Sequence, residues 1–274
     1  MPEFLAPDGA RLAYQDDGSG LPVLALSGLS RNGSDFDYLA QHLPDDVRLI
    51  RLDYRGRGKS EWTGADTYTV PTEAGDALAL LDHLGLEKAA ILGTSRGGLI
   101  AMGLASFAKT RLSGVCLVDI GPELDPAGLE TIRDYIGLNP TQQNYSEATA
   151  MRASLLPGFE GVPETRWAEE VRKHYAETPD GLQINYDPAL RDAVLAMTDA
   201  PMPDLWPMFD ALSDLPLALV RGANSNLLAL STADEMTRRR PDMIRVDIAG
   251  RGHVPFLDEP KALDAITTWI DILR

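Results

Sequence analysis

The sequence predicts an α/β protein whose mostly parallel sheet is covered by helices on both faces. Short, nearly continuous apolar runs alternate along the chain with segments whose apolar residues recur at helical spacing. This alternation is typical of a parallel sheet that is buried on both sides. The expected strands are 22–26, 47–52, 89–92, 114–118, 217–220 and 244–248, and the expected helices are 74–84, 98–108 and 260–273.

The first 20 residues predict a β-hairpin, because the turn dipeptide Asp8-Gly9 precedes an alternating run at 11–14. The helix at 74–84 carries apolar residues at i, i+3 and i+4. Two carboxylates near its start, Glu73 and Asp76, are spaced three apart. We expect both to be solvated positions on the helix surface.

The alternation stops between about Glu123 and Asp210. This stretch has no convincing strand, and Gly- and Pro-containing turns break it into short helical patterns. The sequence therefore predicts a core domain of residues 1–122 and 211–274, with 123–210 inserted as a helical cap. Two aromatic residues of the cap, Trp206 and Phe209, are candidates to line an apolar substrate pocket, and packing within the cap is the competing interpretation.

Charge and cysteine content exclude several classes of protein. The 274 residues include 41 acidic and 25 basic side chains, a net charge of −16. Such a surface repels phosphates and anionic lipids, so we expect neither nucleic acid nor a membrane as partner. The single cysteine, Cys116, cannot form an internal disulfide, and we expect a cytoplasmic monomer or homodimer. No phosphate-binding loop or metal-ligand cluster is apparent, so the sequence predicts a small-molecule substrate and no cofactor or metal.

The segment Gly93-Thr94-Ser95-Arg96-Gly97 has the pattern G-x-S-x-G and lies between an expected strand and an expected helix. A tight turn at this junction lifts a serine hydroxyl above the sheet edge, and the helix N-terminus faces the same point. A serine hydroxyl needs a base to become a nucleophile. His253 is the candidate base, because it follows the last strand in the Gly-rich loop 249–255.

These features together resemble the α/β-hydrolase superfamily. Further similarity lies in the segment 53–60, which resembles the loop after that fold's fourth strand, and in 26–29, which resembles its oxyanion loop with Ser27 where the family often has His. The resemblance covers essentially the whole chain. It implies an eight-stranded, mostly parallel sheet flanked by helices, with the helical cap inserted after strand six. It also implies that the backbone amides of Leu29 and Arg96 form the oxyanion hole.

The catalytic acid departs from the family pattern. Counting by resemblance, Asn226 occupies the usual acid position after strand seven, and an amide cannot stabilise the imidazolium that forms during catalysis. Three interpretations stay open. Some relatives carry the acid after strand six, where this chain has Asp119. Alternatively, Asn226 holds His253 in a weakened site, or another carboxylate such as Asp234 serves.

The leading functional hypothesis is a serine hydrolase of a small carboxylic ester or lactone that works through an acyl-enzyme on Ser95. A C–C bond hydrolase or a perhydrolase would use the same residues. The alternative class is a hydrolase-like protein that binds a small ligand and has a weakened triad. The Arg96 side chain could bind a substrate carboxylate, and a structural ion pair explains it equally well.

Overall fold

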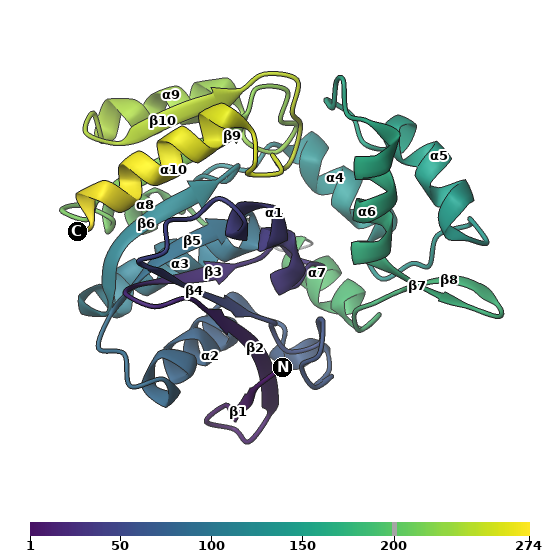
Figure 1. Ribbon diagram of the computed structural model, residues 1–274, viewed down its shortest axis with the longest axis horizontal. Helices are drawn as coiled ribbons and strands as arrows, with labels where there is room; N and C mark the ends of the chain where they lie inside the picture. The colour runs from purple at the N-terminus through teal and green to yellow at the C-terminus, as the bar shows by residue number, and fades with distance from the viewer. Residues whose placement is uncertain (199–201) are drawn as a thin grey trace.

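A computed structural model describes residues 1–198 and 202–274 (Figure 1). Eight strands form one sheet in the order β1-β2-β4-β3-β5-β6-β9-β10. They are β1 (Glu3–Leu5), β2 (Arg11–Asp17), β3 (Leu21–Leu26), β4 (Val47–Leu52), β5 (Ala89–Thr94), β6 (Leu112–Val118), β9 (Leu217–Gly222) and β10 (Ile244–Ile248). All the strands expected from apolar runs are present, so this part of the prediction is confirmed.

The predicted hairpin is formed by the antiparallel strands β1 and β2, and the Asp8 carboxylate accepts a hydrogen bond from the Ala10 amide in its turn. Strand β2 is also antiparallel to β4, whereas the pairs from β4 through β10 are parallel. The carboxyl ends of β5, β6, β9 and β10 therefore meet at one edge of the sheet. In open parallel sheets, ligands bind at this edge.

Alternating residues of the central strands enter two different cores. On β3, Leu24 and Leu26 pack under α2 (Val70–His83), α3 (Arg96–Phe107) and α9 (Leu230–Arg239). Val23 and Ala25 face the opposite layer, which contains α1 (Asp37–Ala40) and α10 (Pro260–Ile272). Because side chains of a strand point alternately to its two faces, both faces must be apolar to be covered by helices. Short 3-10 helices η1 (Gly33–Phe36), η2 (Ala65–Thr67) and η3 (Lys109–Arg111) complete this part of the chain.

The predicted cap segment lies largely to one side of the sheet (Figure 1). It contains α4 (Pro126–Tyr135), α5 (Tyr145–Leu155), α6 (Glu164–His174), α7 (Leu190–Thr198) and α8 (Trp206–Asp210). It also contains an antiparallel hairpin, β7 (Tyr175–Thr178) and β8 (Gly181–Ile184). The expectation that the segment has no strand is therefore wrong. Each strand has four residues, too few for a clear alternation, and only the turn at 179–181 was recognisable.

No helix in the two described ranges is both long and apolar enough to cross a lipid bilayer.

Candidate active site

Ser95 lies in a sharp turn between β5 and α3. Its backbone has φ 49° and ψ −111°, a conformation that a residue with a side chain seldom adopts. The flanking glycines make the turn possible. A Cβ at Gly97 would lie 2.0 Å from the Leu26 carbonyl oxygen, and one at Gly93 would lie 2.5 Å from the backbone of Gly97. The sequence Gly93-Thr94-Ser95-Arg96-Gly97 thus folds as the strand–turn–helix that its motif predicts.

His253 follows β10 and reaches the serine from the other end of the chain. Its Nε2 lies 3.0 Å from Ser95 Oγ, and its Nδ1 lies 2.6 Å from Asp119 Oδ2. The carboxylate can only accept a hydrogen bond, so Nδ1 carries the proton and Nε2 is left to accept from the serine hydroxyl. The imidazole is therefore oriented with Nε2 toward the Ser95 hydroxyl.

Asp119 directly follows β6 and is fully buried. Its φ of 51° turns the side chain toward the loop after β9. Its Oδ1 accepts a hydrogen bond of 2.7 Å from the amide of Gly222, the last residue of β9, and its Oδ2 accepts one of 2.6 Å from the Ser225 hydroxyl in the following loop. These donors fix the carboxylate opposite His253 and satisfy a charge that is costly to bury alone.

The other two candidate acids do not meet His253. The imidazole of His253 has Asp119 and Ser95 as its partners in the described chain. Asn226 lies in the loop after β9, where a Cβ at Gly128 of α4 would lie 2.6 Å from its backbone carbonyl oxygen. Asp234 is exposed on α9 and pairs with Arg245 at 2.7 Å. The end of β9 contributes the amide of Gly222, and the following loop contributes the hydroxyl of Ser225, two contacts to Asp119 that the sequence did not reveal.

Leu29 and Arg96 are the residues expected to form the oxyanion hole. Both line the same pocket as Ser95. The loop that follows β3 lies beside Ser95, since a Cβ at Gly28 would lie 3.9 Å from Ser95 Cβ. The backbone N–H groups of Leu29 and Arg96 donate no hydrogen bond to any residue in the described ranges, so they remain free to bind a ligand oxygen.

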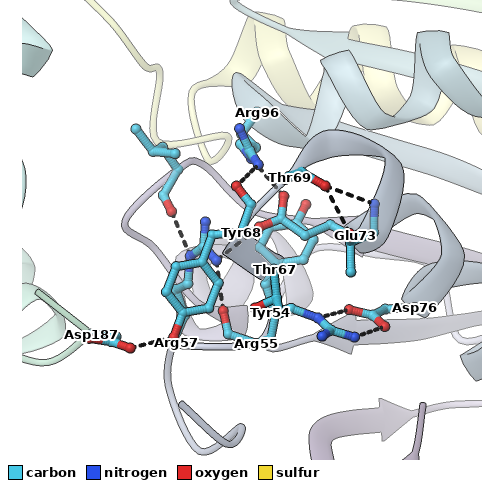
Figure 2. A network of polar contacts seen from close by, with 12 residues as sticks. Tyr54, Arg55, Arg57, Thr67, Tyr68, Thr69, Glu73, Asp76, Arg96 and Asp187 are labelled. Carbon is cyan, nitrogen blue, oxygen red and sulfur yellow. Dashed lines mark hydrogen bonds and ion pairs between the residues drawn. The ribbon is translucent and has the colours of Figure 1, made fainter. Parts of the chain in front are cut away.

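The side chain of Arg96 is part of a buried polar network (Figure 2). Its Nε donates a 2.6 Å hydrogen bond to Glu73, which is fully buried. Asp76 is also buried and pairs with Arg55 at 2.6 Å. The expectation that Glu73 and Asp76 are solvated is therefore wrong. Burial of a carboxylate requires an arginine partner, and these partners lie elsewhere in the sequence.

An apolar pocket opens from Ser95 between the core and the segment 123–210. Core residues and two helices of that segment, α4 and α7, contribute its walls. The lining residues are Leu29, Ser95, Arg96, Leu99, Ile120, Leu124, Leu129, Ile132, Val194, Met197, Thr198 and Leu227. The helical pattern at 129–136 was visible in the sequence, but nothing local indicated which face would meet the active site.

Trp206 and Phe209, the predicted pocket residues, are not among these lining residues. Phe209 is fully buried in the core layer that contains α2 and α3. The Trp206 indole donates a 2.7 Å hydrogen bond to Glu123, and the Arg239 guanidinium lies 4.0 Å from its ring centre. Both aromatics therefore attach α8 to the core, which is the packing interpretation.

Cys116 offers no second nucleophile. It lies in the interior of β6 with no exposed surface, and burial raises the pKa of its thiol to about 12. A thiol with this pKa stays protonated at neutral pH, so it is a poor nucleophile. Among the described residues, no group of three or more His, Cys, Asp or Glu side chains could hold a metal ion.

Comparison with known proteins agrees with this geometry. Residues 23–266 match the model of the alpha/beta hydrolase family. A 3-hydroxybutyrate-oligomer hydrolase of Cupriavidus necator is 34% identical over 95% of this chain and 93% of its own. An esterase of Mycobacterium tuberculosis is 26% identical over 93% of this chain and 84% of its own.

The fold has solved counterparts as well. The crystal structure of an alpha/beta hydrolase from Novosphingobium aromaticivorans superimposes with a TM-score of 0.89 at 33% identity, covering 98% of this chain and 97% of that one. The match spans both the sheet and the segment 123–210. The chain is therefore a hydrolase that belongs to the alpha/beta hydrolase family.

Proposed function

We propose that the protein hydrolyses small carboxylic esters or lactones through an acyl-enzyme on Ser95. The observation that carries the proposal is the continuous chain of contacts from Ser95 Oγ to His253 Nε2 at 3.0 Å and from His253 Nδ1 to Asp119 at 2.6 Å. An ester carbonyl has the electrophilic carbon that an activated serine attacks.

In the first half-reaction, Ser95 Oγ bonds to the ester carbonyl carbon while its proton passes to His253 Nε2. The carbonyl oxygen becomes negatively charged and accepts hydrogen bonds from the Leu29 and Arg96 amides. The carbon–oxygen bond to the alcohol then breaks, and the alcohol leaves with the proton from His253. Asp119 stabilises the imidazolium during both proton transfers.

In the second half-reaction, a water molecule gives one proton to His253 and its oxygen bonds to the acyl carbon. The bond to Ser95 Oγ breaks, the serine regains its proton from His253, and the carboxylic acid departs. A lactone follows the same steps, except that its alcohol stays covalently attached to the acyl group throughout, and the second half-reaction releases a hydroxy acid.

The pocket supports an aliphatic acyl group. Leu99, Ile120, Leu129, Ile132 and Val194 provide an apolar wall beside Ser95, with residues of 123–210 serving as the cap over the substrate. Because a relative that is 34% identical is a 3-hydroxybutyrate-oligomer hydrolase, short oligoesters of 3-hydroxybutyrate are the first physiological substrates to test. The alternative of a pure binding protein depended on Asn226 as the partner of His253, and the imidazole is instead hydrogen-bonded to Asp119.

Labelling by a fluorophosphonate probe, followed by turnover of p-nitrophenyl acetate, butyrate and octanoate, tests the proposal. The wild type should be labelled at Ser95 and should turn over the short esters. Ser95→Ala should lose both properties while retaining the thermal midpoint of the wild type. Labelling of a different serine, or full activity of Ser95→Ala, would overturn the assignment.

A further inference from the structure

A single buried carboxylate connects the two residues that supply the oxyanion hole. Glu73 lies in the first turn of α2 with no exposed surface. Its Oε2 accepts a 2.6 Å hydrogen bond from Arg96 Nε, and its Oε1 lies 2.8 Å from Arg57 Nη1. Figure 2 shows the three side chains converging. Arg57 contacts Leu29, one proposed donor of the oxyanion hole, and Arg96 is itself the other proposed donor.

On one side, Arg57 holds the loop that contains Leu29. Its Nε donates a 2.8 Å hydrogen bond to the Leu29 carbonyl oxygen. The carbonyl of Gly28 in turn accepts a 3.1 Å hydrogen bond from the Arg31 amide. That carbonyl belongs to the same peptide group as the Leu29 N–H, so the direction of the donor is set from both sides.

On the other side, the Arg96 side chain anchors the residue whose own backbone N–H is the second donor. Besides Glu73, its guanidinium contacts the Tyr68 carbonyl oxygen, to which Nη2 donates at 2.9 Å. The Tyr68 ring also packs against Arg57, whose guanidinium carbon lies 5.1 Å from the ring centre. Thus Arg57 and Arg96 share Glu73 and Tyr68 as common partners.

The three buried side chains Arg57, Arg96 and Glu73 carry an unbalanced charge among themselves. The side chains of Arg57, Arg96 and Glu73 are at most 6% exposed, and together they amount to two positive charges and one negative. A buried positive excess beside the hole favours the oxygen that becomes negative in the transition state. Removal of the Glu73 carboxylate would therefore leave two buried cations, Arg57 and Arg96, without the anion that both contact.

We propose that Glu73 is a positioning residue for the oxyanion hole, which aligns the Leu29 and Arg96 amides through Arg57 and Arg96. The inference rests on the proposed function, because it concerns the stabilisation of a tetrahedral intermediate on Ser95. The network extends to the predicted cap as well, since the Tyr68 hydroxyl donates to the Asp187 carboxylate and the Asp187 amide donates to Gly56 at 2.8 Å.

The test compares Glu73→Gln with Asp76→Asn. Both carboxylates are buried on α2, and each is paired with arginine, but Asp76 contacts Arg55 and not an oxyanion residue. Both variants should lower the thermal midpoint, because each removes a buried anion from a buried guanidinium, although Arg55 keeps Asp8 as a second partner at 2.8 Å. We expect only Glu73→Gln to lower kcat for p-nitrophenyl acetate, by about 30-fold with KM within twofold of wild type.

The affinity for a reversible boronic acid inhibitor is a second measurement, and a loss of fold stability alone does not change it. Its adduct with Ser95 places an oxygen in the oxyanion hole, so Glu73→Gln should weaken its binding by about the same factor as it lowers kcat. Glu73→Gln makes the network more positive. If charge alone mattered, both kcat and boronate affinity would stay the same or rise, and that result would overturn the positioning role.

Arg57→Met provides a second variant in case Glu73→Gln does not fold. It leaves Glu73 and Arg96 as a balanced pair and removes the hydrogen bond to the Leu29 carbonyl. We expect a loss of about tenfold in kcat and in boronate affinity. Wild-type values in a folded Arg57→Met would overturn the inference. A wild type that fails to label or hydrolyse esters overturns the proposed function itself, whereas an active wild type with fully active variants overturns the inference alone.

Discussion

The carboxylate of Asp119 lies 2.6 Å from Nδ1 of His253, although 134 positions separate the two residues. Asp119 leaves β6 with a left-handed backbone, and β6 pairs with β5, the strand that precedes Ser95. The acid therefore sits on the strand beside the nucleophile. The imidazole of His253 bridges the two side chains at the sheet edge.

Asp119→Asn should lower kcat for p-nitrophenyl acetate by about three to four orders of magnitude. The amide keeps the size of the side chain but cannot stabilise the imidazolium charge. Asn226→Asp, in the same background or alone, should change kcat little, since the imidazole of His253 is hydrogen-bonded to Asp119 and Ser95. Steady-state kinetics of the three variants checks this. A large gain from Asn226→Asp, with Asp119→Asn near wild type, would reverse the assignment of the acid.

Ser225→Ala should lower kcat by about tenfold. The Ser225 hydroxyl donates to the Asp119 oxygen that faces His253, and its loss frees the carboxylate to rotate. Asn226→Ala is the matched control, because it alters the adjacent position of the same loop. It should retain kcat within twofold. Equal losses in the two variants would point to the loop conformation rather than to the Ser225 hydrogen bond.

Ile132→Trp should shift ester preference toward shorter acyl chains. Ile132 lines the pocket, so a larger side chain there fills space beside Ser95. We expect kcat/KM for p-nitrophenyl octanoate to fall at least tenfold relative to acetate. Trp206→Ala should leave this ratio unchanged while lowering the thermal midpoint, since Trp206 attaches α8 to the core. An altered chain-length ratio in Trp206→Ala would show that the pocket extends to α8.

The stability of the fold should fall below neutral pH because of His174. Burial, followed by repulsion from Arg31 and Arg152, holds the pKa of His174 well below its ordinary value, while a hydrogen bond to the Glu170 carbonyl opposes this and Lys173 adds a further repulsive charge. Arg152 Nη2 donates to the imidazole Nε2 at 3.0 Å, which also requires the neutral ring.

The sign follows from proton binding. Below pH 6.5 the unfolded chain protonates this histidine and the native state does not, so stability present above pH 6.5 is lost as the pH falls. Between pH 7.5 and 5.5 the wild type should lose about 1.4 kcal/mol more unfolding free energy than His174→Asn. Urea titrations of both proteins at the two pH values measure the difference. If the unfolding free energies of the two proteins depended on pH in the same way, His174 would be protonated in the folded state as readily as in the unfolded chain.

Local patterns were sufficient to predict the nucleophile turn and the main sheet. Ser95 sits in a motif whose glycines are required by contacts within the turn itself, and the strands are apolar because both of their faces are covered. The position of His253 after the last strand was recognisable for a similar reason. In each case the physical cause lies in residues that are close in the sequence.

Features that depend on distant partners could not be predicted in this way. Glu73 is buried because Arg57 and Arg96 reach it from other elements, and helical periodicity contains no information about them. Whether Asp119 or Asn226 faces His253 depends on the backbone of two loops. Phe209 packs on the core because α8 returns to it, which the composition of the segment 123–210 did not reveal.

The placement of the acid on β6 has a consequence for exchanging parts between relatives. Asp119 precedes the first residue of the predicted cap, Glu123, by four positions, and His253 follows the cap, so none of the three proposed triad residues lies within 123–210. A chimera joined after Pro122 and again at Ala211 would retain the chemistry and replace the α4 and α7 walls of the pocket. Recombination at these two junctions should therefore generate new acyl-group specificities without rebuilding the catalytic machinery.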